Sequence, residues 1–418
     1  MFDVLLPTDV FPPKTGGAGW STFALAQALQ DRGHRVLALV PQRGKSGISY
    51  RVEQGVDVVD VGYHAPNLPF VANYARFERF WSRFAQAIVQ VAGDFDRERL
   101  IIHGQHIQGI GAGVLAGAQL GVPVVATVRD HWARHYFATG LHGDQFPYDR
   151  WNWAGVATDL IARNQPLVGL VSTLAVPYIQ AHMNRRRAFL ARCDAVISLS
   201  NYITQHLHGI VAPDKLHPIP NIVDLDLIER IIATPQTSIK HDQPYVLFVG
   251  KLARNKGAYL LPTVMQAMHN AGANADLVIA GGSDASLIKH IEATRTRVHA
   301  LNWADHDEVL RLMHGAAALV FPSTWGEPLS RVLLEACAVG MPIAAMPTGG
   351  TPDILVHKHN AMLASTAELL GQAVAQLVRD RTFAQRLAQN ARRTAHERFA
   401  AQVVIEQVEQ VYERVQRR

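Results

Sequence analysis

Short, continuous apolar runs recur along the first half of the chain, and stretches with helical spacing separate them. Residues 2–7 predict a buried strand, and residues 20–33 predict a helix with Phe23, Leu25 and Leu29 on its inner side. Further strands are predicted at residues 36–40, 100–103, 123–128 and 195–199. Because the runs are continuous and do not alternate with polar residues, they are typical of parallel strands that helices cover on both faces.

The same alternation starts again after Pro220. This half predicts strands at residues 245–250, 275–280, 317–322 and 342–345, helices at 260–271 and 331–339, and only helix beyond 367. Two alternating halves indicate an α/β chain with two doubly wound, parallel-sheet (Rossmann-like) domains. Ligands of such sheets lie beyond the carboxyl ends of the strands, so we expect two facing domains to enclose a cleft. The polar segment 224–243 is the predicted connection.

Composition supports a globular protein and narrows its chemistry only a little. The 418 residues are 48% hydrophobic and 18% charged, which excludes a disordered chain. The net charge of +5 suits anionic partners without choosing among nucleotide phosphates, anionic lipids and nucleic acid. Cys193 and Cys337 lie far apart and form no disulfide framework or metal-ligand spacing. With no apparent signal peptide and no apolar run of about 18 residues, we expect a cytoplasmic protein.

A basic loop follows the strand predicted at residues 245–250. Lys251, Arg254 and Lys256 lie within six residues at its carboxyl end. Two ammonium groups in one loop are suited to binding a diphosphate as point charges. The alternative is a solvated basic loop without a ligand.

A second loop, in residues 321–336, leads from a strand into a helix that begins near Ser330. Glu327 precedes the helix, whose N-terminus favours anions. Glu335 lies inside the helix among apolar neighbours, where a carboxylate is costly to bury without a partner. A pair of sugar hydroxyls would be such a partner. In the alternative interpretation Glu327 caps the helix and Glu335 faces solvent.

Three features together resemble the retaining GT-B glycosyltransferases of glycosyltransferase family four, also called glycosyl transferases group 1. They are the spacing Glu327-x7-Glu335, the Val-Gly-Lys-Leu-x3-Lys-Gly loop at residues 249–257, and Gly349-Gly350-x-Pro352-Asp353. The glycine-rich stretch 11–19 and the segments 194–200, 219–224 and 277–282 resemble the family in the same order. The resemblance covers most of the chain.

The resemblance implies three regions: an acceptor-binding domain at residues 1–223, a nucleotide-sugar-binding domain at 224–395, and a helix at 396–418 that crosses back to the first domain. It implies that the lysines bind the diphosphate of the donor and that Glu335 accepts hydrogen bonds from the ribose. Backbone N–H groups at the helix start would bind the sugar and phosphate, and the glycines would let the backbone approach the donor. These residues are Gly16, Gly17, Lys251, Lys256, Leu329, Ser330, Arg331 and Glu335.

The resemblance also implies a reaction. A sugar would pass from a UDP- or GDP-sugar to a saccharide or lipid-linked acceptor with retention of configuration, without a metal or another cofactor. Glu327 would contact the donor sugar. The catalytic candidates are Glu327 and Arg129, the latter standing where the family commonly has histidine. Lys251 replaces the family's usual arginine, which keeps the charge and loses bidentate geometry.

Other functions stay open at this point. Gly111-Ala112-Gly113, with Asp130 downstream, loosely fits the dinucleotide fingerprint of a dehydrogenase, although the glycines do not directly follow a strand. They are better explained by close helix packing. A nucleotide-sugar epimerase with the GT-B fold and a non-catalytic nucleotide-sugar-binding protein are the remaining alternatives.

Two further segments carry predictions about packing. Residues 167–179 are apolar and precede His182, Arg185, Arg186 and Arg187, so this region predicts either peripheral contact with an anionic membrane, on the inner face, or a buried helix. Near the C-terminus, valines recur at helical spacing and predict a helix that packs back on the N-terminal domain. They are Val403, Val404, Val408, Val411 and Val415.

Overall fold

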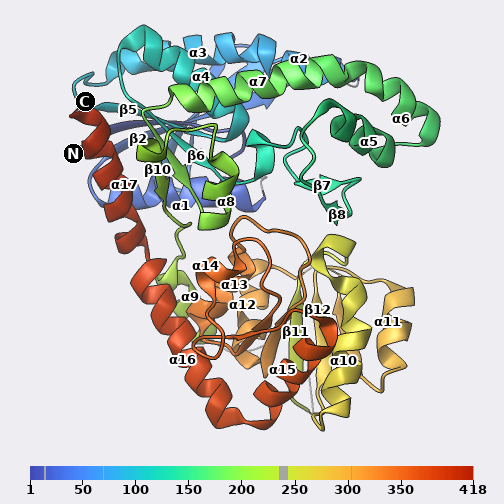
Figure 1. The fold of residues 1–418 in the computed structure, drawn as a ribbon. Coiled ribbons are helices and arrows are strands. Elements are labelled where there is room, and N and C mark those ends of the chain that lie inside the picture. The colour runs from blue at the N-terminus through green and yellow to red at the C-terminus, as the bar shows by residue number, and fades with distance from the viewer. Residues whose placement is uncertain (14–15, 69, 235–242, 303, 418) are drawn as a thin grey trace. The chain divides into compact units, whose positions relative to one another are not determined.

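The computed structural model describes residues 1–13, 16–68, 70–234, 243–302 and 304–417. The chain divides into two compact units (Figure 1). Unit 1 comprises Met1–Gly140, Asp149–Ile222 and Ala401–Arg418. Unit 2 comprises Leu141–Tyr148 and Val223–Ala400. Unit 1 is therefore built from separate stretches of the chain.

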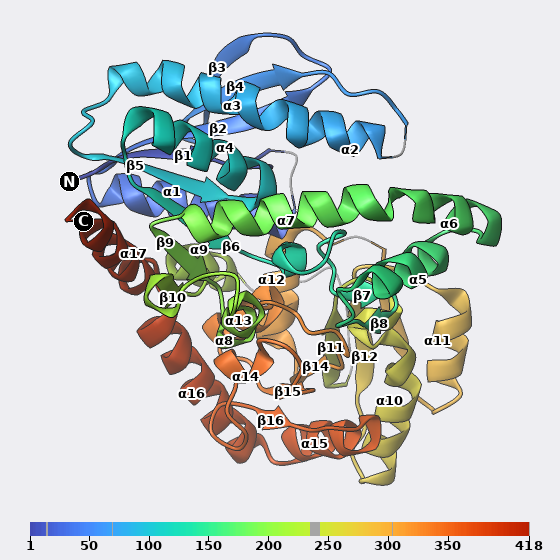
Figure 2. The ribbon, with the colours of Figure 1, turned by 45° about the horizontal axis from the view of Figure 1, so that its top comes forward.

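An eight-stranded sheet forms the centre of unit 1, in the order β10-β9-β6-β5-β1-β2-β4-β3. Only the edge pair β3–β4 is antiparallel among the pairings of this sheet, and Figure 2 shows it at one edge. The strands are β1 (Asp3–Pro7), β2 (Arg35–Arg43), β3 (Ile48–Glu53), β4 (Val56–Tyr63), β5 (Leu100–Gln105), β6 (Val124–Val128), β9 (Ala195–Ser198) and β10 (Leu216–Pro218).

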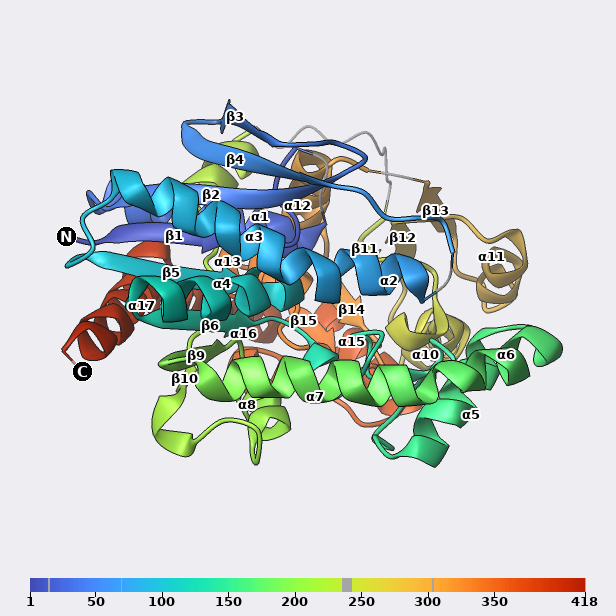
Figure 3. The same cartoon turned by 90° about the horizontal axis from the view of Figure 1, so that it is seen from above.

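Helices cover both faces of this sheet (Figure 3). One face packs against α3 and α4, and the other against α1 and α17. The helices of unit 1 are α1 (Gly17–Asp31), α2 (Val71–Arg76), α3 (Glu78–Val91), α4 (His106–Leu120), α5 (Trp153–Arg163), α6 (Pro166–Ser172), α7 (Val176–Arg192), α8 (Asn201–Leu207) and α17 (Ala401–Gln416).

The last helix, α17, is part of the core of unit 1. Val404, Val408 and Val411 are buried with residues of β1, β2 and α1. The Tyr412 hydroxyl lies 2.7 Å from Nδ1 of the buried His103. Glu409 forms ion pairs with Arg32 and His34 at the end of α1 and just beyond it, each at 2.8 Å. The apolar face of α17 is thus covered by unit 1.

Unit 2 contains a six-stranded parallel sheet in the order β13-β12-β11-β14-β15-β16. Its strands are β11 (Tyr245–Val249), β12 (Asp276–Ala280), β13 (Val298–Leu301), β14 (Ala318–Phe321), β15 (Ile343–Ala345) and β16 (Met362–Leu363). Its helices are α9 (Leu225–Ile232), α10 (Leu261–Asn270), α11 (Ala285–Glu292), α12 (His306–Gly315), α13 (Arg331–Val339), α14 (Thr351–Ile354), α15 (Ala367–Arg379) and α16 (Arg381–Arg398).

Shorter elements complete the two units. Two strands pair in an antiparallel hairpin, β7 (Leu141–His142) and β8 (Phe146–Pro147). Six single turns of 3₁₀-helix are η1 (Ala92–Asp94), η2 (His131–Ala133), η3 (Thr173–Ala175), η4 (Pro213–Lys215), η5 (Arg254–Lys256) and η6 (Ala258–Leu260) among the described residues.

The predicted class, two doubly wound parallel sheets, is confirmed. Helix α9 occupies the first part of the predicted connection, and residues 235–242 lie outside the described part of the chain. No helix in the described ranges combines the length and the apolar character needed to cross a bilayer.

The order of the strands marks one position in each sheet for a ligand. In unit 1 the chain builds β2 and β4 on one side of β1 and then continues with β5 on the other side. In unit 2 it builds β12 and β13 on one side of β11 before β14 on the other. Such switch points open a crevice at the carboxyl ends of the strands. The residues that follow β1, β5, β11 and β14 are therefore the first candidates for function.

Candidate functional site

The loops after β11 and β14 pack directly on each other in unit 2. The Asn255 carbonyl accepts hydrogen bonds from the N–H groups of Thr324 and Trp325, each at 3.1 Å. Gly257 has a φ of +73°, and a Cβ there would overlap the Pro322 carbonyl group. The basic loop is thereby fixed beside the loop that carries Glu327.

This packing brings together two of the predicted site residues. The Lys256 ammonium lies 2.9 Å from Oε1 of Glu327 and 5.0 Å from the centre of the Trp325 ring. Glu327 is buried, and although Oε1 is in ion-pair contact, it accepts no hydrogen bond with good geometry from the described residues. A sugar hydroxyl could supply that hydrogen bond.

The glycine pair at residues 349 and 350 holds the backbone of Glu327. The N–H of Gly350 donates to the Glu327 carbonyl at 2.7 Å. Gly349 has a φ of +55°, and a Cβ there would lie 2.5 Å from the Glu327 nitrogen. Any larger residue at position 349 would displace Glu327, so this glycine positions the carboxylate indirectly.

Glu335 is buried inside α13, so the alternative in which it faces solvent is wrong. His306 Nε2 and an Arg331 guanidinium nitrogen both lie 3.1 Å from its Oε1. Burial alone would raise the pKa of this carboxyl, but the hydrogen bond from His306 and the charge of Arg331 outweigh it and lower the pKa. Glu335 is thus ionised at neutral pH. Among the described residues none donates to Oε2, which leaves that oxygen for a ligand.

The start of α13 also fits an anion. Ser330 occupies the N-cap position, is buried, and makes no side-chain capping hydrogen bond within the described part of the chain. Leu329 is buried beside it. The first N–H groups of a helix lack acceptors inside the helix, and its dipole favours negative charge there. Lys251 lies apart from these contacts, exposed at the end of β11.

A second group of polar residues lies at the switch point of unit 1. Asp9 follows β1, His106 follows β5 and Asp130 follows β6. Asp9 accepts the backbone N–H groups of Gln108 and Gly109 at 2.7 and 3.1 Å, at the start of α4. Nδ1 of His106 lies 3.8 Å from Oδ2 of Asp130.

His106 shows two unusual features. Its φ of +59° lies in the left-handed region, which residues other than glycine seldom adopt. Its Nε2 atom is buried and makes no hydrogen bond to the described residues. A strained residue with an unsatisfied polar atom at a switch point indicates a binding site.

The acidic groups of this cluster have raised pKa values. Burial raises the pKa of Asp9 to about 6, although Arg76 opposes this shift. Burial likewise raises the pKa of Asp130 to about 7, against the hydrogen bond from the Trp132 N–H. Burial and the charge of Arg129 lower the pKa of His106 to about 3, so this imidazole is neutral. The cluster can therefore hold a proton on a carboxyl near neutral pH.

The Arg129 side chain forms hydrogen bonds within unit 1. Its guanidinium donates to Oε1 of Gln105 at 2.8 and 3.2 Å and to the Asn221 side chain. These contacts join the ends of β5 and β6 to the segment after β10. The buried Arg129 side chain thus joins three segments of unit 1, and its contact with substrate stays a prediction.

The other predicted residues of unit 1 lie at the start of α1. Gly16 and Gly17 are exposed, and a Cβ on Gly16 would meet nothing within 4 Å. No packing among the described residues therefore requires glycine at position 16. The dinucleotide-fingerprint alternative is wrong, because Gly111 and Gly113 lie inside α4. A Cβ on Gly111 would lie 2.5 Å from Trp81, so this glycine serves helix packing.

The sequence pattern missed Asp9, Asp130 and His306 as site residues. Each of the two aspartates closely follows an apolar strand, which is the signal that singled out Lys251. His306 lacks such a signal, since only the tertiary structure brings it to Glu335.

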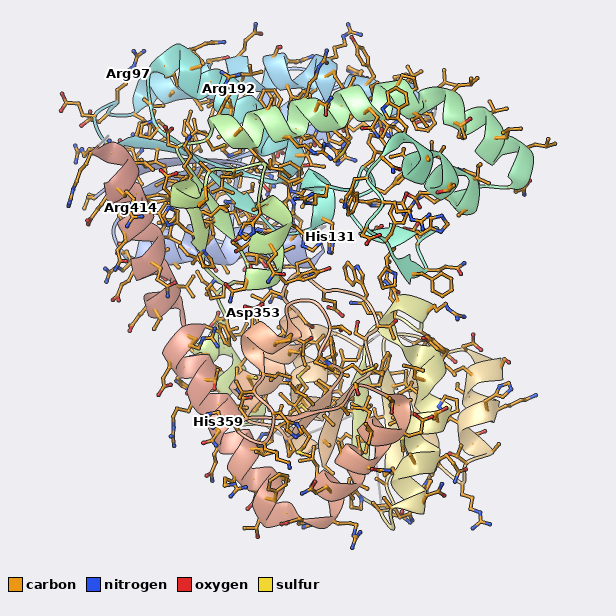
Figure 4. The ribbon with its side chains drawn as sticks, viewed as in Figure 1. Arg97, His131, Arg192, Asp353, His359 and Arg414 are labelled. Atoms are coloured by element: carbon orange, nitrogen blue, oxygen red, sulfur yellow. The ribbon has the colours of Figure 1, made fainter. Side chains whose placement is uncertain are left out.

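Figure 4 labels His131, which follows Asp130 and lies near α8, where its Nε2 is 3.1 Å from the Tyr202 hydroxyl.

Two protein-family models match the chain and together cover nearly all of it. "Glycosyltransferase Family 4" matches residues 15–227, and "Glycosyl transferases group 1" matches residues 230–394. The boundary between the two matches lies close to the boundary between Ile222 and Val223 that separates the compact units.

Curated relatives match parts of the chain. An uncharacterized glycosyltransferase of Methanocaldococcus jannaschii is 27% identical over 199 residues, covering 46% of this chain and 50% of that protein. Alpha-maltose-1-phosphate synthase of Mycolicibacterium smegmatis is 25% identical over 256 residues, covering 55% and 65%. The chain spans about half the length of the first curated relatives it matches.

Solved structures show the same fold over the whole chain. The Anabaena protein HepE in complex with UDP superposes with a TM-score of 0.69 at 17% identity, covering 99% of this chain and 100% of that chain. Sucrose-phosphate synthase from Thermosynechococcus elongatus superposes with a TM-score of 0.66 at 19% identity, covering 99% of each. The predicted GT-B fold is thereby confirmed.

Proposed function

The chain belongs to glycosyltransferase family 4, and from this premise we propose that it transfers a sugar from a UDP- or GDP-sugar to a saccharide or lipid-linked acceptor, with retention of configuration. The observation that carries the proposal is the switch point of unit 2. There Lys256, the start of α13 and the ionised Glu335 offer complementary groups to a diphosphate and a ribose.

The donor would bind along the loops after β11 and β14. Lys251 and Lys256 offer positive charge to the diphosphate, and the start of α13 offers N–H groups from Leu329 to Arg331. Oε2 of Glu335 would accept the ribose hydroxyls, while His306 and Arg331 keep the carboxylate ionised. Oε1 of Glu327 would accept a hydrogen bond from a hydroxyl of the sugar. HepE, which shares the fold, has been crystallised with UDP-glucose.

The acceptor would bind at the switch point of unit 1. His106 offers a neutral, unsatisfied Nε2, and Asp130 offers a carboxyl group that retains 28% exposure. Both suit hydroxyl groups of a saccharide. At the start of α1, Gly16 and Gly17 would let a ligand approach the backbone, since a Cβ on Gly16 would meet nothing within 4 Å among the described residues.

In the proposed reaction the bond between the sugar's C1 and the phosphate oxygen breaks, and a bond from C1 to the acceptor oxygen forms on the same face. The acceptor's proton passes to the leaving phosphate oxygen. Lys251, Lys256 and the start of α13 stabilise the charge that develops on the diphosphate, so the proposal needs no metal. A peripheral contact with a membrane would bring the protein to a lipid-linked acceptor.

Binding and turnover test this proposal separately. Thermal shift with a panel of nucleoside diphosphates should identify the base, since a ligand at 100 times its Kd stabilises a protein by about 2.7 kcal/mol. Incubation with the matching nucleotide sugar and an acceptor should release nucleoside diphosphate, and NMR of the product should show the donor's anomeric configuration.

Each alternative outcome has its own signature. An epimerase would change the sugar's stereochemistry away from the anomeric carbon without net transfer to an acceptor. A non-catalytic binder would show the thermal shift and no turnover across donors and acceptors. An inverted product would reject the retaining mechanism.

A further inference from the structure

Helices α2 and α6, with the turn η3 that follows α6, expose an unusual apolar surface on unit 1. Leu167 and Leu174 are 81% and 82% exposed, and Val171 is 66% exposed. Together with Val71 and Tyr74 of α2 they line an open groove of about 800 Å³. We call these five residues the α2–α6 surface. Figure 3 shows α6 at the far end of α7, beyond the sheet and the main body of unit 1.

The way α6 is attached explains why its large side chains face outward. The helix has the sequence Pro-Leu-Val-Gly-Leu-Val-Ser, which is apolar on every side. Its Gly169 is buried, and a Cβ there would lie 2.7 Å from the Cα of Ile161 in α5. The glycine side is therefore the attached side, and leucine and valine side chains are left exposed. Apolar surface of this kind on a folded unit indicates an interaction site.

The helices that continue from the α2–α6 surface, α3 and α7, carry an excess of positive charge. The segments 71–91 and 166–192 contain one acidic residue, Glu78, which is bound internally to His182 and Tyr178. The same segments contain seven arginines: Arg76, Arg79, Arg83, Arg185, Arg186, Arg187 and Arg192.

Not all of these arginines face solvent. The basic cluster that the sequence predicts at His182 and residues 185–187 is therefore only partly exposed. Arg186 and His182 are buried, and Arg186 donates to the carbonyl oxygens of Trp132 and Tyr136. Arg187 is half-buried and donates to the Ala133 carbonyl. Arg79 on α3 and Arg185 on α7 remain exposed. The buried-helix alternative is wrong for Leu167, Leu170 and Leu174, which are exposed, and right for Ile179, which is fully buried.

We propose that the α2–α6 surface inserts into an anionic lipid bilayer, with Arg79 and Arg185 against the lipid headgroups. A second copy of the chain would place arginines against arginines, whereas an anionic bilayer offers the opposite charge. At 1.5 Å per residue, α6 is about 10 Å long, which suits burial at the boundary between headgroups and acyl chains. The inference extends the membrane contact of the proposed function, but vesicle binding requires neither donor nor acceptor.

Cosedimentation with vesicles tests the insertion. The wild-type protein should bind vesicles of phosphatidylcholine with phosphatidylglycerol and bind phosphatidylcholine alone at least tenfold more weakly. Leu167→Asp with Leu174→Asp should weaken binding to the anionic vesicles at least tenfold, whereas Leu369→Asp, at a leucine 47% exposed in unit 2, should leave it unchanged. Arg79→Glu with Arg185→Glu should weaken binding at least tenfold, and Arg414→Glu on α17 is the matched control (Figure 4).

Folding and nucleotide binding are followed in the same variants. Each should keep the wild-type melting temperature and the wild-type thermal shift with nucleoside diphosphate, because the changed side chains are exposed and lie outside the proposed donor site. Absence of wild-type binding at low salt, or equal loss in the control variants, would overturn the proposal. So would a dimer of the wild-type protein that Leu167→Asp with Leu174→Asp dissociates, since the surface would then bind a second copy. Failure of the donor site would appear separately, as vesicle binding without a nucleotide shift.

Discussion

Glu335 is a buried carboxylate that stays ionised because of its hydrogen-bond partners. The α13 helix places its carboxylate among apolar neighbours, and His306 and Arg331 both donate to the same oxygen. Two cationic or donor groups therefore keep it ionised without using Oε2. This arrangement leaves Oε2 available to accept a further hydrogen bond.

Replacing Glu335 by glutamine should lower kcat/KM for the nucleotide sugar about a hundredfold, equivalent to about 2–3 kcal/mol, while the fold survives. The amide would lose the charged acceptor for the ribose hydroxyls. Steady-state kinetics on the folded variant measures the effect, with Glu368→Gln on the exposed side of α15 as control. Wild-type kinetics in Glu335→Gln would remove this residue from the donor site.

The two lysines should behave differently when each is replaced by alanine. Both changes should weaken nucleoside diphosphate binding much more than nucleoside binding, because each removes charge from the phosphate. Only Lys256→Ala should also destabilise the protein, by about 1–3 kcal/mol, because it leaves the buried Glu327 without its counter-charge. Calorimetry and urea unfolding measure the two effects. Equal losses for nucleoside and nucleotide would contradict the diphosphate role.

Asp130 should make stability depend on pH. Its pKa is raised from 3.8 to about 7, so the folded protein keeps a proton that the unfolded chain releases. This group therefore lowers the free energy of unfolding as pH rises through that range. The neighbouring Asp9 shifts in the same direction, while Arg186 opposes it. The free energy of unfolding of Asp130→Asn, measured by urea unfolding, should therefore rise relative to that of the wild type as the pH increases from about 5 to about 8. A constant difference across this range would refute the raised pKa.

At the scale of elements, the apolar runs predicted most of the parallel strands, because such strands are covered on both faces. The buried strand β4 was missed, since Asp57 and Asp60 interrupt its apolar run. The prediction for residues 245–250 fits β11, and that for 331–339 matches α13. The edge strand β3 was missed, since its side chains are all exposed or half-buried and its sequence is not an apolar run. Half-buried β13 was missed for the same reason.

The candidate site was predictable where chain order alone places residues together. Lys256 and Glu327 follow neighbouring strands of one sheet, so the topology brings them into contact. The partner of Glu335 was not predictable, because His306 begins a helix whose orientation depends on the packed core. The hydrogen bonds of Arg129 to Gln105 and Asn221 could not be predicted either, because these residues lie in three separate segments of the chain.

The helix α17 carries a prediction at the same scale. Tyr412→Phe should destabilise the protein by about 1–3 kcal/mol, because Nδ1 of the buried His103 would lose its partner. Tyr50→Phe is the control, since that side chain is 70% exposed on β3. Thermal or urea unfolding measures the difference. Equal stability of both variants would mean that the contact contributes nothing.

At the scale of the whole molecule, the proposed chemistry relies on charges that the chain itself supplies. Transfer should therefore continue in EDTA at close to the untreated rate, because lysines and a helix start stabilise the leaving diphosphate. Release of nucleoside diphosphate in chelated and untreated samples measures this. Complete loss of activity in EDTA, restored by magnesium or manganese, would reject the metal-free mechanism.

The position of α17 in the core of unit 1 has a consequence for the order in which the protein is made. Residues 1–222 are synthesised before residues 223–400, yet one face of their sheet is covered in part by α17, which is synthesised after all of unit 2. Unit 2, whose core comes from one stretch of chain, can fold while the first-made part still exposes the surface that Val404, Val408 and Val411 will cover. During synthesis, unit 1 is thus completed after unit 2, and apolar surface that is uncovered in that interval is prone to aggregation.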